Sequence, residues 1–261
     1  MPVEIVIYLD KCEVQQVINV LQTLPACLQP KYFSEEETVK SKKDQVGDEK
    51  RFNKFISHNP IGFFLFGESC MYDIALQSKG YTKIYCDIND ESLYSHIPLF
   101  FRVMATIYPI FGFAGENQER LPDADGSYVI THEEVTSERD HRNKHFITIG
   151  INHIESGIGN DLNKYIPGVY WYTLLSDELL KKHNVNLSNL SGESISCELL
   201  GDDSLYLLKF YENPEDWRVH ADRLDDLCEK VDGMFSRRDV EKALVGVDSY
   251  LDYDDIISEW R

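Results

Sequence analysis

The sequence predicts an α+β fold with a largely antiparallel sheet, helices packed on one side and a helical, acidic C-terminal region. The main evidence is two pairs of β-rich segments joined by short turns, residues 71–77 with 81–87 and residues 194–199 with 205–211. Strands joined by so short a turn pair antiparallel. Helical patterns gather after the second pair instead of alternating with strands, which favours α+β over a parallel α/β fold.

The first part of the chain predicts two strands and a helix. Residues 3–9 are β-rich and predict a strand. Residues 13–24 carry apolar side chains at helical spacing, and Pro25 ends that pattern. Residues 34–51 are almost wholly polar and predict a solvated loop or an exposed helix. The unbroken apolar run at 61–66 predicts a strand buried on both faces.

A long buried helix is predicted after the first hairpin. A broad apolar stripe extends over residues 91–108, with Asp90 as a capping residue and Pro109 at its end. Residues 115–145 are rich in charge, with one apolar island at 128–130. This segment predicts a loop or an exposed helix.

The second half predicts further strands and helices around the second hairpin. Residues 145–151 and 168–174 predict strands. Ser176 is placed to cap a short helix over 177–183, and Pro214 is placed to start another helix.

The domain organisation has two interpretations. Residues 1–261 can form a single α+β domain of the usual size. Alternatively, two α/β halves, 1–114 and 145–261, are joined by the polar segment 115–144. The sequence leaves both open.

Charge limits the classes of partner. The 261 residues include 45 acidic and 26 basic side chains, which gives a formal net charge of −19. Binding to nucleic acid or to an anionic membrane is disfavoured, because Lys and Arg must neutralise the phosphates and are outnumbered here. The sign of the charge suits a basic partner protein, or simply solubility.

The chain is expected to stay in the cytoplasm. Its N-terminus has no basic segment before the first apolar run, unlike a signal peptide. No apolar stretch approaches the ~20 residues of a transmembrane helix. The six cysteines form no C-x-x-C pair and lie within apolar patterns, so we expect buried free thiols.

No motif predicts catalysis, a metal or a cofactor. His141 and His145 have the spacing of a helical metal site, but His145 fits the start of a strand better. Gly157 and Gly159 lack the third glycine and the Lys of a phosphate-binding loop. Cys70 has no identifiable partner histidine, so a buried thiol is the better interpretation. We therefore expect a non-enzymatic protein, and keep a small α+β hydrolase or transferase with an unrecognised site as the alternative.

Acidic residues concentrate near the C-terminus. From Glu198 to Arg261 there are 18 acidic and eight basic residues, a net charge of −10. Many alternate with Tyr and Trp, which are enriched at interface hot spots. A solvated helical face, a docking surface and a nucleic-acid mimic all fit this pattern. The candidate partner-binding residues are Asp202, Asp203, Asp248, Tyr250, Asp252, Tyr253, Asp254, Asp255 and Trp260.

Residues 165–176 (YIPGVYWYTLLS), followed by Glu178, Leu179 and His183, resemble bacterial immunity proteins of type VI secretion and polymorphic toxin systems. In that family, a Pro-Gly-apolar-Tyr/Arg-Trp segment precedes a short helix in an α+β domain. Residues 207–211 and 214–217 are similar in style, and the resemblance covers about residues 160–220.

The resemblance implies a cytoplasmic protein that binds and neutralises a cognate toxin domain. It implies a structural role for the motif residues Pro167, Gly168, Tyr170 and Trp171. The C-terminal acidic region lies outside the family pattern. The sequence leaves open whether the protein is a monomer or a homodimer. It also leaves open a different function, that of an acidic adaptor protein of phage or defence origin.

Overall fold

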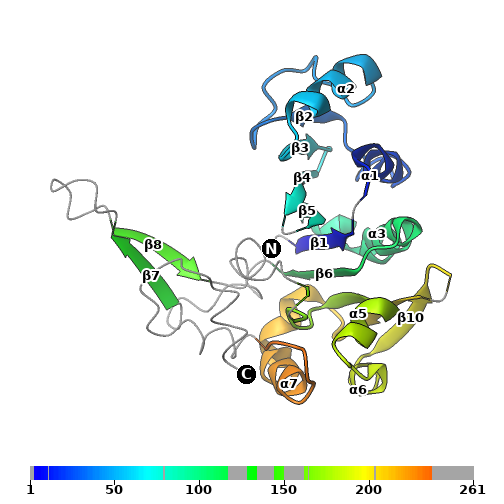
Figure 1. Cartoon of the computed structure of the whole chain (residues 1–261), viewed down its shortest axis with the longest axis vertical. Helices are drawn as coiled ribbons and strands as arrows, with labels where there is room; N and C mark the ends of the chain where they lie inside the picture. The colour runs from blue at the N-terminus through cyan, green and yellow to red at the C-terminus, as the bar shows by residue number, and fades with distance from the viewer. Residues whose placement is uncertain are drawn as a thin grey trace.

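The fold is α+β and is built on one large antiparallel sheet, which confirms the predicted class (Figure 1). The computed structural model describes residues 3–10, 12–78, 80–116, 128–133, 144–149, 162–163, 165–202 and 204–236. Nine of the described strands form the sheet in the order β10-β11-β9-β6-β1-β5-β4-β3-β2. Two further strands, β7 (Tyr128–Glu133) and β8 (Lys144–Ile149), form a separate antiparallel pair.

The strands of the large sheet come from both sides of the predicted boundary at residues 115–144. They are β1 (Val3–Leu9), β2 (Tyr32–Ser34), β3 (Gly62–Phe66), β4 (Cys70–Ser78), β5 (Tyr81–Ile88), β6 (Phe111–Glu116), β9 (Tyr172–Ser176), β10 (Ser196–Leu200) and β11 (Leu205–Lys209). Because β9 pairs with β6, strands from the two halves share one sheet.

The helices are short, and several are 3-10 helices, labelled η. They are α1 (Val14–Leu21), α2 (Glu49–His58), η1 (Glu91–His96), α3 (Ile97–Met104), η2 (Ala105–Ile107), α5 (Asp177–Lys182), α6 (Leu187–Ser191), η5 (Pro214–Asp216) and α7 (Trp217–Glu229). Helices α5, α6 and α7 lie at the β9–β11 end of the sheet (Figure 1).

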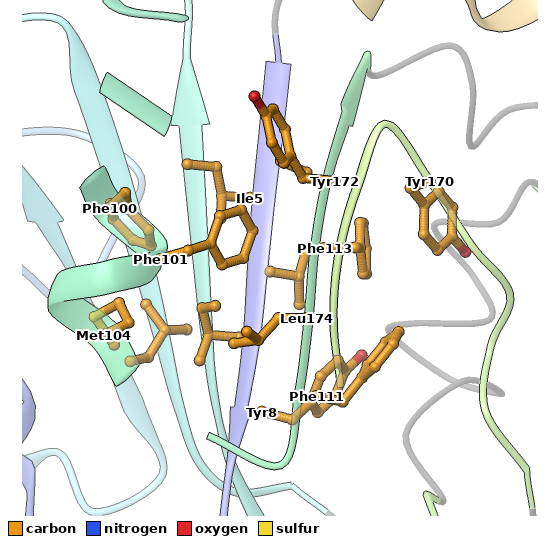
Figure 2. Close-up of a cluster of buried hydrophobic side chains, with 14 of the residues drawn as sticks. Ile5, Tyr8, Phe100, Phe101, Met104, Phe111, Phe113, Tyr170, Tyr172 and Leu174 are labelled. Atoms are coloured by element: carbon orange, nitrogen blue, oxygen red, sulfur yellow. The ribbon is translucent and has the colours of Figure 1, made fainter. Parts of the chain in front are cut away.

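The first strand lies at the centre of the sheet, where β1 pairs with β5 on one side and β6 on the other. All its residues are buried. Figure 2 shows Phe101 and Met104 of α3 on one side of the central strands and Phe113 of β6 with Tyr170 on the other. The Phe113 and Tyr170 rings stack with centroids 4.1 Å apart. The core therefore has an apolar layer on each side of the sheet, rich in aromatic side chains.

Both predicted hairpins form. β4 pairs with β5, and β10 pairs with β11 through the turn that contains Asp202. The helix predicted at residues 177–183 also forms as α5, and the Ser176 side chain accepts a hydrogen bond from the Leu179 N–H at 3.1 Å.

Two strand predictions need correction. β3 alternates between buried and half-buried residues instead of being buried on both faces, because one face of this part of the sheet is partly open. The strand predicted at 168–174 begins only at Tyr172. Gly168 has a φ of +95°, which is outside the strand region and lets the chain turn before β9.

The long helix predicted at 91–108 is three shorter pieces, η1, α3 and η2. Pro98 lies in the first turn of α3 and has no N–H to continue the hydrogen bonding of η1. After the predicted end at Pro109, residues 111–116 form β6, a strand the sequence pattern did not reveal. The segment predicted as a loop or exposed helix also contains β7 (Tyr128–Glu133), whereas the strand predicted at 145–151 appears as β8 (Lys144–Ile149).

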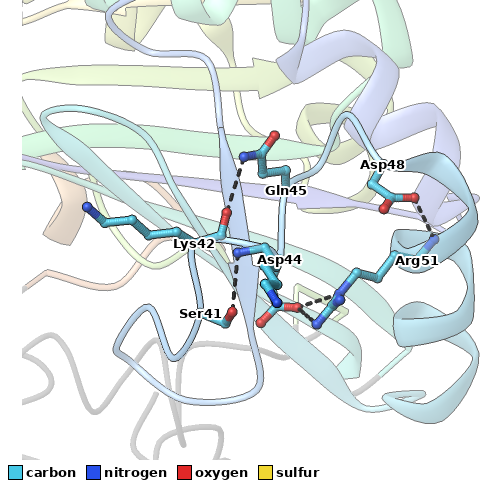
Figure 3. Close-up of polar contacts among 7 residues, drawn as sticks. Ser41, Lys42, Asp44, Gln45, Asp48 and Arg51 are labelled. Carbon is cyan, nitrogen blue, oxygen red and sulfur yellow. Dashed lines mark hydrogen bonds and ion pairs between the residues drawn. The ribbon is translucent and has the colours of Figure 1, made fainter.

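The two edges of the large sheet differ. At β2, residues 44–46 run along the outer edge: the Phe33 N–H donates to Asp44 O at 3.0 Å and the Val46 N–H to Lys31 O at 3.0 Å. Asp44 in turn binds Arg51, and Asp48 caps α2 (Figure 3). At the opposite end, β10 has β11 as its one strand neighbour in the described part of the chain.

All six cysteines are free thiols, but not all are buried. Cys70, Cys86 and Cys228 are buried, whereas Cys197 is exposed on β10. Cys12 and Cys27 are half-buried. The prediction of buried thiols therefore holds for three of the six, and it is wrong for Cys197 because an edge strand leaves its side chain uncovered. Among the residues that the structure describes, no helix combines the length and the apolar character needed to cross a bilayer.

Candidate protein-binding surface

Carboxylates gather at the end of the sheet where β1 begins and β5 and β6 end. The register places Glu4 of β1 opposite Asp87 of β5, and Val3 opposite Glu116 of β6. Three acids from three neighbouring strands therefore lie at the same end of the sheet. Glu4 and Glu116 are buried, and Asp87 is half-buried.

A small pocket opens at this end of the sheet. Its volume is about 140 Å³, and it is lined by Glu91 and Tyr94 of η1, Glu116 of β6, and Pro214 and Glu215 of η5. We refer to these five residues as the acidic pocket. The three carboxylates come from elements far apart in the sequence, and the fold alone brings them together.

The negative charges converge on Tyr94. Burial, followed by the charges of Glu91, Glu116, Glu215 and Asp87, raises the pKa of Tyr94 to about 12. The phenol stays neutral at physiological pH because ionisation would add another negative charge to an acidic environment. The same surroundings favour a cation.

Glu4 and Asp87, which face each other at this end of the sheet, form a crowded pair of carboxylates. The Tyr85 hydroxyl donates to Glu4 at 2.7 Å, and the Asn89 amide donates to Asp87 at 3.1 Å. Burial and then the charge of Glu4 raise the pKa of Asp87, against the opposing effect of Asn89. Carboxylates so close together favour the approach of positive charge.

The motif residues border the acidic pocket from the core side. The Trp171 ring meets Tyr94 edge-on with centroids 6.3 Å apart, and the indole N–H donates to Glu212 O at 3.2 Å. The Tyr170 hydroxyl donates to Pro167 O at 2.7 Å, which closes the turn at Gly168. All four motif residues are buried, which fits a structural role in packing, and Trp171 is the one with a described contact to the pocket, through Tyr94.

Of the nine candidate partner-binding residues, Asp202 lies within the described part of the chain. It is exposed in the β10–β11 turn, has a φ of 44°, and accepts a hydrogen bond from the Tyr108 hydroxyl at 2.8 Å. Asp202 and the acidic pocket lie at opposite ends of the η1–α3–η2 segment. The other eight, Asp203, Asp248, Tyr250, Asp252, Tyr253, Asp254, Asp255 and Trp260, lie outside the described residues.

The other residues weighed from the sequence give no reactive arrangement. Cys70 is buried, with its sulfur 3.6 Å from Leu28 O, and a hydrogen bond with Cys86 lowers the pKa of its thiol despite burial. Tyr72, beside this pair, donates its hydroxyl to Leu28 O at 2.6 Å. The His141 and His145 side chains and the Gly157–Gly159 segment lie outside what the structure describes. Within the described ranges, no group of His, Cys, Asp or Glu has the geometry of a metal site.

Sequence reasoning missed the acidic pocket for a clear reason. Its carboxylates lie at positions 91, 116 and 215 and share no spacing. The local signals are the acid at the end of each strand or start of each 3-10 helix, but these are also typical of any acidic surface. The information that was needed is the register of β1, β5 and β6 together with the packing of η1 against β5 and of η5 against β6.

Compared with known proteins, the chain matches no family model, no curated protein and no solved structure. The arrangement described above defines an α+β protein with an acidic pocket at one end of its sheet, and the interpretation of its function depends on that arrangement and on charge.

Proposed function

We propose that the protein is a non-enzymatic immunity protein that binds and neutralises a basic cognate toxin domain in the cytoplasm. The observation that carries this proposal is the acidic pocket, in which three carboxylates surround an aromatic ring at the surface of a chain with net charge −19. The resemblance at residues 165–176 supports the same function, and Trp171 of this segment packs against Tyr94 of the pocket.

The chemistry of the pocket suits the end of a Lys or Arg side chain. Carboxylates attract the cation, and the Tyr94 ring can contact it through a cation–π interaction. Its volume of about 140 Å³ is below the ~300–1,000 Å³ of typical small-molecule sites, so one anchoring side chain fits better than a substrate. The larger pocket between α1 and α2, of about 310 Å³, has Glu49 as the one ionisable residue in its described lining.

The high negative charge should also raise the rate of association with a basic partner. Complementary charge steers partners together and can raise association well above the ~10⁵–10⁶ M⁻¹s⁻¹ of an unsteered pair. A toxin must be captured before it acts, so fast capture is the property an immunity protein needs.

The test begins with the protein encoded beside this one. Co-expression should restore growth that the neighbour suppresses, and the two should elute together in gel filtration. Within that complex, Glu215→Lys should weaken binding at least tenfold, because it puts a cation into the pocket. Glu178→Lys on α5, an exposed acid of the same type, is the matched control and should bind as the wild type does.

A second experiment tests the acidic residues near the C-terminus, which the sequence singles out. Charge reversal at Asp252, Asp254 and Asp255 should slow association and flatten its dependence on salt. A neighbour that is harmless, or a pair that does not form a complex, would refute the proposed function. Equal binding by Glu215→Lys and Glu178→Lys would place the interface away from the acidic pocket.

A further inference from the structure

Within the part of the chain that the structure describes, the outer edge of β10 has no strand beside it. The described strands give β10 one neighbour, β11, and four of its five residues are exposed or half-exposed. The opposite edge of the same sheet is covered by residues 44–46. Proteins usually protect such edges, so an open one indicates pairing with another chain.

Exposed apolar side chains gather around this edge. Ile195 and Leu199, at 52% and 47% exposure, lie beside and on β10. Tyr108 is tied to the β10–β11 turn through Asp202. Leu99 lies one turn before Arg102 on the face of α3 that binds β10. These four make up more than half of the exposed large hydrophobic residues in the described part of the chain.

The charges at this edge are neutralised within the chain. Arg102 binds Glu198 of β10 through two hydrogen bonds of 2.8 Å. Arg223 binds Glu193, just before β10, at 3.1 Å. Unlike the acidic pocket, the edge therefore offers little to a basic partner, and it is a place where a second acidic chain can approach.

We propose that a second copy of this chain pairs antiparallel with β10, so that two large sheets join across a two-fold axis at Cys197. A two-fold axis perpendicular to the sheet leaves each side chain on the same face of the sheet. A residue of β10 therefore pairs only with a residue of the second copy whose side chain lies on that face, and the axis passes through a residue. The symmetric choices centre on Cys197, on Glu198 or on their neighbours.

Like charges disfavour the register centred on Glu198. The apolar side chains favour the one centred on Cys197, which pairs Ile195 of each chain with Leu199 of the other. With the axis there, Cys197 faces its own copy and Ser196 faces Glu198 of the other chain. With the axis on Glu198, two carboxylates face each other directly, which is destabilising. The register on Cys197 also places the Leu199 of each chain beside the segment that carries Ile195 in the other.

The strand pair is short, so its strength depends on the flanking side chains. Stable interfaces bury about 1,200–2,000 Å² in total, more than a pair of five-residue strands provides alone. Leu99 and Tyr108 extend the contact on the α3 side. We therefore expect a dimer whose population rises with concentration, not an obligate one.

Analytical ultracentrifugation of the full-length protein tests the proposal. The wild type should shift from monomer to dimer as concentration rises. Leu199→Lys should raise the dissociation constant at least tenfold, because it sets a cation at the apolar part of the edge. Val219→Lys, an equally apolar and 81% exposed site on α7, is the matched control and should leave the dimer unchanged.

Cross-linking tests the register without depending on any destabilising variant. A short bis-maleimide adds to two thiols by forming two thioether bonds, and should link Cys197 to Cys197 of the second copy. Cys197→Ser should abolish the linked dimer. A protein that stays monomeric at every concentration would overturn the proposal, as would a dimer that tolerates Leu199→Lys or cross-links equally well without Cys197. Because the toxin-binding test uses Glu215, its result is independent of this one.

Discussion

Gly112 lies at a tightly packed point of the core, where α3 meets the sheet. It lies on β6 opposite Ile7, and a Cβ atom built there would lie 2.7 Å from Ile7 Cδ1 and 3.0 Å from Val6 O. Phe101 closes the same space from α3 at 3.4 Å. The absence of a side chain lets α3 approach the sheet closely.

Gly112→Ala should therefore destabilise the protein by about 1–3 kcal/mol, because the added methyl group overpacks a core that has backbone on one side. Urea denaturation followed by circular dichroism measures this. Gly47→Ala is the matched control, since a Cβ there meets no atom within 4 Å, and it should change stability by less than about 0.5 kcal/mol. Equal effects of the two variants would contradict the packing argument.

The pKa of Tyr94 measures the electrostatic effect of the carboxylates in the acidic pocket. In the unfolded chain its pKa returns to the ordinary value near 10, whereas in the folded protein it is about 12. As pH rises from 10 to 12, the unfolded state ionises first, so this residue lowers folding stability over that window. Below pH 10 it has no such effect.

Two measurements check this behaviour. When tyrosine ionisation is followed by absorbance, the difference between the wild type and Tyr94→Phe should be a single group that titrates near pH 12. Stability of Tyr94→Phe should fall less steeply than that of the wild type between pH 10 and 12. Glu215→Gln should lower the pKa of Tyr94, while Glu178→Gln should not. A Tyr94 that titrates near 10 would show that the carboxylates do not converge on it.

At the scale of elements, the short helix α5 depends on the residue that caps its N-terminus. Ser176 ends β9 and accepts a hydrogen bond from the Leu179 N–H at 3.1 Å, while Asp177 and Glu178 occupy the positive end of the helix. With six residues, α5 has little stability of its own, so its cap matters more than in a long helix.

Ser176→Ala should lower the free energy of unfolding by about 1 kcal/mol, the usual cost of losing an N-terminal cap. Ser188→Ala in α6 provides a comparison at an exposed serine whose side chain does not cap its helix. Thermal unfolding of both variants measures the difference. If both lose the same amount, the contribution of the cap is negligible.

Elements with a strong local pattern could be predicted, and those decided by their neighbours could not. The two hairpins, β1 and α5 carry their signals within a few residues of sequence. β6 reads FGFAGE and lacks the β-branched residues of a typical strand, yet it is buried because β1 and β9 flank it. The late start of β9 depends on the turn at Gly168, which local periodicity does not record.

At the scale of the molecule, the charge could be read from composition, but its arrangement could not. The sequence directs attention to the C-terminal acids, of which Asp202 lies in the described part of the chain. The acidic pocket instead depends on strand register and on η5 returning to β6 from the second half of the chain. The contrast between this pocket and the neutralised edge at β10 is the reason why we propose a different partner for each surface.

The central position of β1 has a consequence for synthesis on the ribosome. Strands β6, β1, β5, β4, β3 and β2 all come from residues 3–116, so this part of the sheet can assemble as soon as those residues emerge. Until β9 arrives, β6 is itself an edge that exposes apolar side chains. Residues 117–171 take roughly 3–11 s to synthesise at about 5–20 residues per second. During that interval we expect a ribosome-associated chaperone to bind the exposed edge of β6. Several ribosomes on one messenger RNA would bring such edges close together.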